Sequence, residues 1–194
     1  MTIDIERVAD IVSLKLGEYP DWRRRRDSPG AGASLDVMIE PIVEEVALME
    51  ALAADLGSFR DLRDFRLDVY TNADYGNDAY GEYELPEDFL RLAAFRMGGW
   101  PRMLNEELPG DAQRCALGEG APDWLRERAR RPWIEVLPLG EGKVLRFGPF
   151  RGRFPTVASY VPRPRYDAKT RQLTGVDPTQ LIGIAERLAA FIAG

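Results

Sequence analysis

The segment 85–100, LPEDFLRLAAFRMGGW, combines the end of one secondary-structure element with the whole of another. Tyr83 and Leu85 alternate with acidic residues as in a half-buried strand, and Pro86 ends the alternation. The proline and the two carboxylates after it are typical of the first turn of a helix, where the dipole favours negative charge. Apolar residues then recur at helical spacing, at Phe89, Leu92, Ala93 and Met97. The segment therefore predicts a strand that ends at Leu85 and a helix from Pro86 to about Gly98.

Three other stretches carry apolar residues at helical spacing, namely 3–16, 34–57 and 178–192. The first should stop near Gly17, and the second starts either at the Ser34 cap or at Pro41. The apolar stripe of the second stretch is broad. Two interpretations stay open for it: a helix buried in the core, and a helix that also packs on a neighbouring subunit.

Alternation with a period of two predicts strands at 65–70, 133–137, 143–147 and 156–161. The second and third form a hairpin around the turn Leu139–Gly142. Turn residues dominate 71–81, which we interpret as a hairpin-like surface loop, and a short helix is expected at 123–130. The order of elements predicts an α+β fold, with helices packed with a small antiparallel β-sheet. We expect two parts: an N-terminal helix with a flexible arginine-rich arm at 1–33, and a single α+β domain at 34–194.

Composition excludes several classes of function. The 194 residues include no histidine and one cysteine, Cys115, so imidazole-based catalysis, a cysteine-rich zinc site and an internal disulfide are excluded. The net charge of −6 argues against nonspecific nucleic-acid binding as the main task. The N-terminus has no signal-peptide pattern, and no apolar run reaches the ~18 residues of a membrane span. We expect a soluble intracellular protein.

Three groups of residues were weighed as chemical sites. Hard oxygen ligands for calcium occur at Asn72, Asp74, Asn77 and Asp78, but their spacing does not match an EF-hand. Glu87 and Asp88 are adjacent carboxylates, and helix-start charge explains them better than acid–base catalysis. Cys115 lacks a histidine base. We therefore expect no catalytic, cofactor-binding or metal site.

Aromatic and arginine residues are the best candidates for a protein interface. The candidates are Arg23, Arg24, Arg25, Arg26, Tyr75, Tyr80, Trp100, Arg102, Trp124 and Arg128. The alternatives are tryptophans packed in the core with solvated arginines, and stacking on single-stranded nucleic acid. The arginine run and the loop 72–81 are candidate docking segments that become ordered on assembly.

Three blocks of sequence, in the same order, resemble a family of phage and prophage proteins known from Bacteroidetes and their phages. The blocks are Glu82–Met97 followed by Gly99-Trp100-Pro101-Arg102, then Gly142–Phe147, then Ala158–Asp167. Together the likeness spans roughly residues 35 to 192. More distantly, the layout is similar to head–tail connector and tail-adaptor proteins of tailed phages. The arginine run 23–26 and the stretch 118–131 depart from this pattern.

The resemblance implies a structural virion protein of the phage neck and not an enzyme. Proteins of that kind form oligomeric rings, commonly of twelve copies, between the portal of the head and the tail. The implied partners are further copies of the chain, the portal protein and tail proteins, with DNA passing through the lumen without sequence-specific binding and with no membrane. The implied location is the virion, and the host cytoplasm during assembly. The alternative is a non-catalytic protein-binding module of a prophage or mobile element.

Overall fold

The computed structural model describes residues 2–17, 34–66, 71–75, 78–108, 131–140, 142–150 and 155–193, with the backbone alone for 71–75 and 78–80. The protein has an α+β fold in which helices pack against small antiparallel sheets, as predicted. The chain forms two compact units, one made of residues 1–61 and 162–194 and the other of residues 62–161. We call them unit 1 and unit 2. Residues 34–194, predicted as one domain, thus contribute to both units.

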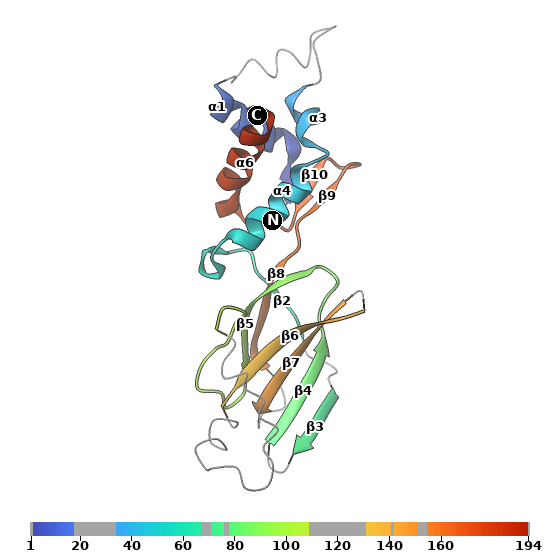
Figure 1. Ribbon diagram of the computed structural model, residues 1–194, viewed down its shortest axis with the longest axis vertical. Coiled ribbons are helices and arrows are strands. Elements are labelled where there is room, and N and C mark those ends of the chain that lie inside the picture. Colours follow the sequence, from blue (N-terminus) through green and yellow to red (C-terminus); the bar gives the residue numbers. More distant parts are fainter. Residues whose placement is uncertain are drawn as a thin grey trace. The chain divides into compact units, whose positions relative to one another are not determined.

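Unit 1 contains four described α-helices, two short 3-10 helices and one small sheet (Figure 1). Its helical elements are α1 (Ile5–Leu16), α3 (Leu35–Ile39), α4 (Val43–Ala53), η1 (Leu56–Ser58), η2 (Pro178–Gln180) and α6 (Leu181–Ala193). Its strands are β1 (Thr2–Asp4), β9 (Arg165–Asp167) and β10 (Gln172–Thr174), in the order β1-β10-β9. The sequence patterns did not predict these three short strands.

The first helix ends where the sequence predicts and begins two residues later than predicted. The Asp4 side chain accepts a hydrogen bond from the Glu6 backbone N–H at 2.9 Å, which caps the N-terminus of α1. Gly17 ends the helix in the left-handed conformation, with φ 73°. The predicted helix in 3–16 is confirmed, although its first two residues, Ile3 and Asp4, lie in β1.

The predicted helix at 34–57 is divided in two by a turn at 40–42. Pro41 lies in this turn, and a proline has no backbone N–H to continue an α-helix. The two predicted starts each correspond to one of the two helices: Ser34 precedes α3, although its side chain caps no backbone N–H and bonds the Asp36 carboxylate instead, and Pro41 lies two residues before α4. The second helix, α4, buries Val43, Val46, Ala47 and Ala51.

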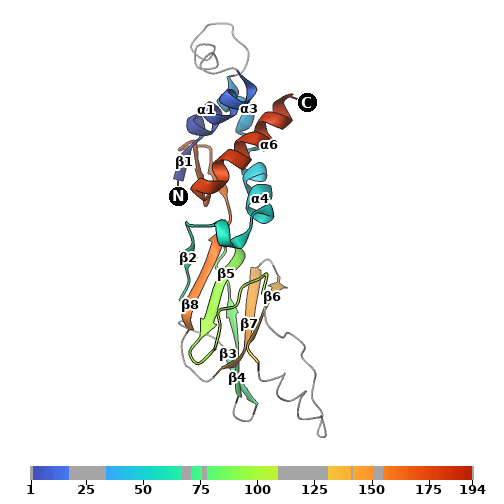
Figure 2. The ribbon, with the colours of Figure 1, turned by 90° about the vertical axis from the view of Figure 1, so that its left-hand side faces the viewer.

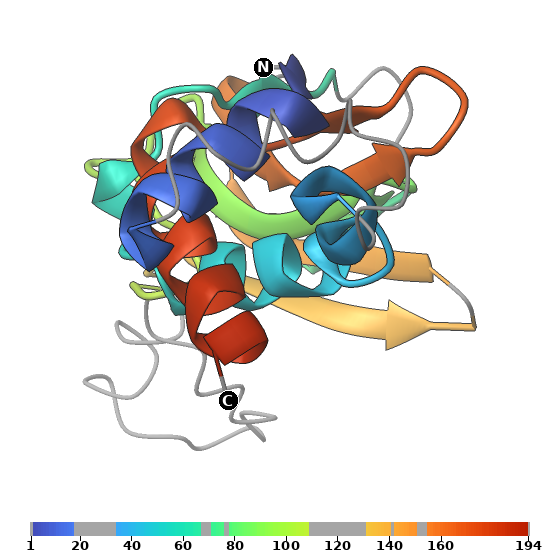
Figure 3. The same ribbon diagram turned by 90° about the horizontal axis from the view of Figure 1, so that it is seen from above.

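The core of unit 1 joins segments from both ends of the chain. Helix α6 packs against α1 and α4, and α1 also packs against α3, as the view along the unit shows (Figure 3). Fully buried members include Val12, Ile39, Val43, Leu173 and Ile184. Because these residues come from five elements, the unit forms only when the N-terminal 61 residues meet the C-terminal segment.

Unit 2 is built from two antiparallel sheets (Figure 2). Its strands are β2 (Arg63–Asp64), β3 (Thr71–Tyr75), β4 (Asp78–Glu84), β5 (Phe89–Met97), β6 (Trp133–Leu139), β7 (Gly142–Phe150) and β8 (Pro155–Pro162). One sheet has the order β2-β8-β5 and the other β3-β4-β7-β6.

The helix predicted from Pro86 to Gly98 is wrong, because residues 89–97 form strand β5. Seven of its nine residues are buried, and they point to both faces of the strand. Leu92, Phe95 and Met97 have no exposed surface. A strand buried on both faces has no polar alternation, so its apolar run also satisfies the helical spacing. Length and flanking residues, Pro86 before and two glycines after, are the signals that favour a strand.

The predicted hairpin at 133–147 is confirmed as β6 and β7, with Ile134 opposite Phe147 in the register. The predicted strand at 156–161 is confirmed as β8. The turn-rich stretch 71–81, expected as a loop, instead contributes the antiparallel pair β3 and β4. The strand expected at 65–70 is wrong in its bounds: β2 covers residues 63–64, and 67–70 lie outside the described residues.

Aromatic rings fill the core of unit 2. The rings of Phe95 and Phe147 have centroids 4.9 Å apart, and those of Phe147 and Phe150 lie 5.3 Å apart. Gly81, opposite Phe147 across β4 and β7, leaves room for that ring, because a Cβ atom there would lie 2.3 Å from Phe147 Cζ. The core therefore depends on one small residue facing one large one.

Candidate interaction surfaces

Exposed apolar side chains concentrate on the helices of unit 1. Of the ten large apolar residues that are exposed in the described part of the chain, seven lie on these helices. They are Leu14 on α1, Val37 and Met38 on α3, Met49 and Leu52 on α4, and Ile182 and Phe191 on α6. Single exposed apolar residues are ordinary, but several on neighbouring turns of one helix indicate a binding surface.

Helix α4 has two apolar faces. One packs in the core of unit 1 through Val43, Val46 and Ala47. On the opposite side Met49 is 45% exposed and Leu52 is 54% exposed. A helix that is apolar all round is normally covered on every side. The outer face of α4 is therefore apolar like a surface that a partner covers. The prediction that this helix packs on a neighbouring subunit stays a prediction.

The segment of chain that carries this face has charged residues of one sign. Residues 34–59 contain no lysine or arginine, and their acidic residues are Asp36, Glu40, Glu44, Glu45, Glu50 and Asp55. Five of these bond within unit 1: Asp36 and Glu40 to Arg171, Glu44 to the Tyr166 N–H, Glu50 to Arg187, and Asp55 to the Gly57 N–H. Glu45 is exposed on the outer face of α4. A complementary partner would be apolar and basic.

The predicted interface residues divide into three groups. Arg23 to Arg26, Trp124 and Arg128 lie outside the described residues, and Tyr75 and Tyr80 lie on β3 and β4, where only the backbone is described. Trp100 is 7% exposed and its Nε1–H donates to the Pro149 carbonyl at 2.8 Å, so its ring belongs to the core. Arg102 is exposed. The exposed residues of α3 and α4 were not among the candidates, although the broad stripe at 34–57 was the signal for them.

The adjacent carboxylates Glu87 and Asp88 do not start a helix. Asp88 instead accepts a hydrogen bond from the Tyr160 hydroxyl at 2.8 Å and pairs with Arg63. These contacts tie the turn before β5 to β8 and β2. Burial, then the hydrogen bond to Asp88, raises the pKa of Tyr160. The arrangement is structural, because both oxygens of Asp88 are engaged by neighbouring strands.

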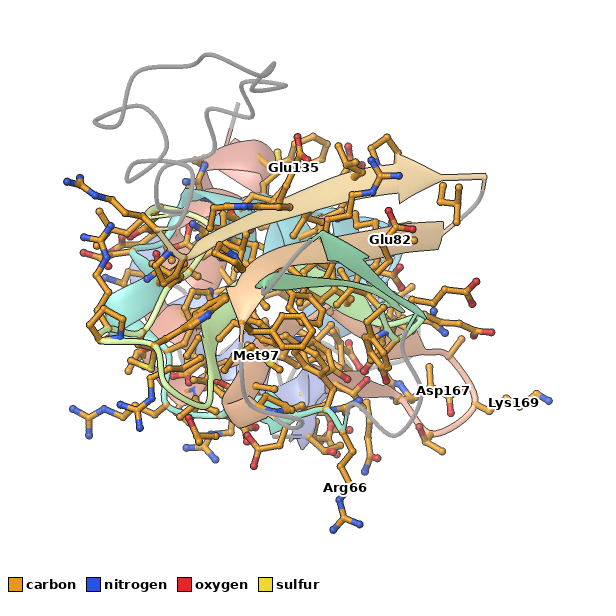
Figure 4. All side chains as sticks on the ribbon, turned by 90° about the horizontal axis from the view of Figure 1, so that it is seen from below. Arg66, Glu82, Met97, Glu135, Asp167 and Lys169 are labelled. Atoms are coloured by element: carbon orange, nitrogen blue, oxygen red, sulfur yellow. The ribbon has the colours of Figure 1, made fainter. Side chains whose placement is uncertain are left out.

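A row of charges crosses the four-stranded sheet of unit 2. Glu82 on β4, Arg146 on β7 and Glu135 on β6 are in register, and Figure 4 labels the two glutamates. Arg146 forms an ion pair with Glu82. Cross-strand pairs of opposite charge stabilise a sheet, so this row is explained by strand pairing.

Within the described ranges, no group of three His, Cys, Asp or Glu residues is arranged to hold a metal ion. The four residues with calcium-type oxygen atoms, for which no metal site is expected, fall in 72–78; Asn77 lies outside the described residues and the other three are described by backbone alone. Cys115 and the helix expected at 123–130 also lie outside. No described helix has both the length and the apolar character to cross a membrane.

Comparison with protein-family models, curated proteins and solved structures found no match to this chain. The likeness to phage neck proteins therefore rests on the three sequence blocks. In the structure these blocks occupy β4 and β5, the first part of β7, and β8 with β9. Strand β4 pairs with β7, and β5 is the neighbour of β8. Segments far apart in sequence thus meet in one pair of sheets.

Proposed function

We propose that this chain is a structural virion protein of the phage neck, a subunit of an oligomeric ring that joins the portal of the head to the tail. The observation that carries the assembly part of the proposal is the second apolar face of α4, with Met49 and Leu52 about half exposed. The three sequence blocks support the assignment to a phage neck. A ring subunit acts by binding its neighbours, so no catalytic residue is part of the proposal.

Closed rings need two different patches on each subunit, since the contact joins unlike surfaces head to tail. Unit 1 has exposed apolar residues on α1 and α6 as well as on α3 and α4. This distribution suits a heterologous contact better than a single self-complementary patch. The number of copies, commonly twelve in proteins of this kind, belongs to the proposal and to its test.

The test is the mass of the purified full-length chain by light scattering across a wide concentration range, followed by negative-stain images. Closed rings of uniform diameter are the expected result. If the chain stays monomeric alone, the same measurement is made with candidate portal proteins. A chain that remains monomeric in both settings would contradict the proposal and favour the second candidate, a non-catalytic binding module of a prophage or mobile element.

A further inference from the structure

The outer faces of α1 and α4 have the same layout with opposite charge. On α1, Arg7 and Leu14 are exposed, and Leu14 is 59% exposed. On α4, Glu45 and Leu52 are exposed, and Leu52 is 54% exposed. Residues seven apart on a helix lie only ~20° apart around its axis. Each helix therefore presents one stripe with a charge at one end and a leucine two turns later.

Both stripes lie opposite the buried face of their helix. In α1 the buried residues are Ile5, Val8, Ala9, Val12 and Ser13, and in α4 they are Val43, Val46, Ala47 and Ala51. At 100° per residue, Arg7 and Leu14 point ~180° from the centre of the first set, and Glu45 and Leu52 do so from the second. The two stripes thus face away from the core of unit 1.

The charges at the ends of the stripes are available to a partner. Among the residues that the structure describes, neither Arg7 nor Glu45 forms an ion pair. Midway along the stripes lie Ile11, which is half-buried, and Met49, which is 45% exposed. Asp10, half-buried, also lies on the α1 stripe. At its ends the α1 stripe offers a cation, Arg7, and a leucine, which complement Glu45 and Leu52 at the ends of the α4 stripe, while Asp10 is an acidic residue between them.

The two stripes are on different sides of unit 1. Helix α6 packs against both α1 and α4, and it runs between them in the view of Figure 2. The stripes therefore do not meet within one copy. Two complementary surfaces that point in different directions on the same unit generate a head-to-tail contact, and such contacts close into a ring when the rotation permits.

We propose that the outer face of α4 in one copy binds the outer face of α1 in the next copy, with Glu45 facing Arg7 and the leucines packed beside them. This inference rests on the proposed ring function and names its contact surface. One charge at the end of each stripe favours one direction and one register, because reversing one helix places Arg7 against Leu52 and Glu45 against Leu14 and leaves both charges without a counter-ion.

Charge reversal tests the contact directly. Arg7→Glu and Glu45→Arg should each raise the concentration at half-assembly about three- to tenfold, since each creates a like-charge pair. The double variant restores opposite charges and should assemble within about twofold of the wild type. Arg66→Glu in unit 2 is the matched control, because Arg66 is exposed and points away from the ribbon in Figure 4. Circular dichroism checks that every variant keeps its helices.

Cross-linking gives a second readout that does not depend on charge. In a Cys115→Ser background, Leu14→Cys with Leu52→Cys should form disulfide-linked ladders longer than a dimer under mild oxidation. Each single cysteine variant should stay monomeric, because residue 14 meets residue 52 of the next copy and neither residue meets its own counterpart. A ladder from the double variant together with no dimer from either single variant requires unlike surfaces to meet, which separates this contact from a two-fold symmetric one.

The outcomes separate this inference from the function on which it rests. Rings that tolerate both single charge reversals and give no ladder would overturn the contact and leave the ring function standing. Variants of Glu45 that form normal rings but no longer bind a portal protein would show that the α4 face binds the portal. That result would also overturn the proposed contact between α4 and α1. A wild-type chain that forms no ring, alone or with a portal, would overturn both proposals.

Discussion

Replacing Asp177 by asparagine should destabilise unit 1 by roughly 2–4 kcal/mol at neutral pH. Asp177 is 2% exposed, and its two carboxylate oxygens accept four hydrogen bonds. Oδ2 accepts from the backbone N–H groups of Arg60 and Asp61, and Oδ1 accepts from the N–H and the hydroxyl of Thr179. The residue therefore caps η2 and also holds the last residues of unit 1 before the chain passes into unit 2.

The magnitude follows from which bonds asparagine can keep. An asparagine still caps a helix well, so the bonds to Thr179 survive. Its amide group then faces the N–H groups of Arg60 and Asp61, and two donors lose their acceptor. A part-buried donor left without an acceptor costs ~1–3 kcal/mol, and the bonds lost are charge-assisted. Partial access of water to these two N–H groups keeps the sum toward the lower part of the range.

The loss should depend on pH. Burial by itself would raise the pKa of Asp177, but the bonds from Thr179 and Arg60 hold the pKa below its usual range. A carboxyl with a depressed folded-state pKa adds stability above its unfolded-state pKa of ~3.9, and loses it as the pH falls through the folded value. Asparagine does not titrate. The gap between wild type and variant should therefore be largest near pH 7 and narrow below pH 4.

Urea unfolding followed by circular dichroism at the helix band measures this gap, because the α-helices of the described residues are in unit 1. Asp55→Asn is the control: Asp55 is exposed and caps η1 through one bond to the Gly57 N–H at 2.8 Å. The loss of unfolding free energy in Asp55→Asn should be much smaller than in Asp177→Asn. A loss below ~1 kcal/mol for Asp177→Asn, or a gap that stays constant from pH 7 to pH 3, would refute the reasoning.

Three further predictions concern other contacts. Gly81→Ala should lower the stability of unit 2 by ~1–3 kcal/mol, since its new methyl group meets the Phe147 ring at 2.3 Å; thermal unfolding by near-ultraviolet signals would show it, and an unchanged midpoint would contradict it. Arg171→Ala should lower the stability of unit 1 by ~2 kcal/mol in urea unfolding, because the Asp36 carboxylate, whose side chain is 1% exposed, loses its cation. A variant as stable as the wild type would contradict the burial of this ion pair. Asp88→Asn should lower the pKa of Tyr160 in a spectroscopic titration by removing a nearby negative charge, and a higher pKa would argue against the contact.

Local signals predicted the elements that bury one face or end at a specific residue. The left-handed Gly17 ends α1 as predicted, and Asp177 with Pro178 opens the final helical segment. The β6–β7 hairpin follows from its alternation and its glycine turn, in which Gly140 has φ 59°. In each case the deciding interaction spans a few residues, so a short window of sequence contains the whole signal.

The sequence predicted only part of the candidate surface on the outer face of α4. The broad apolar stripe at 34–57 indicated two faces, but the residues on the outer one depend on which side of α4 meets α6. Sequence patterns make Trp100 a candidate for an interface with core packing as the alternative, and the structure places it beside Phe95 in the core, with ring centroids 5.7 Å apart. Exposure is a property of the packed unit, and residue type alone does not determine it.

By itself, the sequence determined the α+β class, the capped helices and the β6–β7 hairpin, because caps, turns and one-sided periodicity act over short distances. Only the tertiary structure decided that residues 89–97 form a strand, since a segment buried on both faces carries no periodic signal. It also decided that the first 61 residues and the last 33 share one core, and that α1 and α4 leave complementary faces outside it. Those outcomes depend on contacts between residues more than a hundred positions apart, which no local pattern encodes.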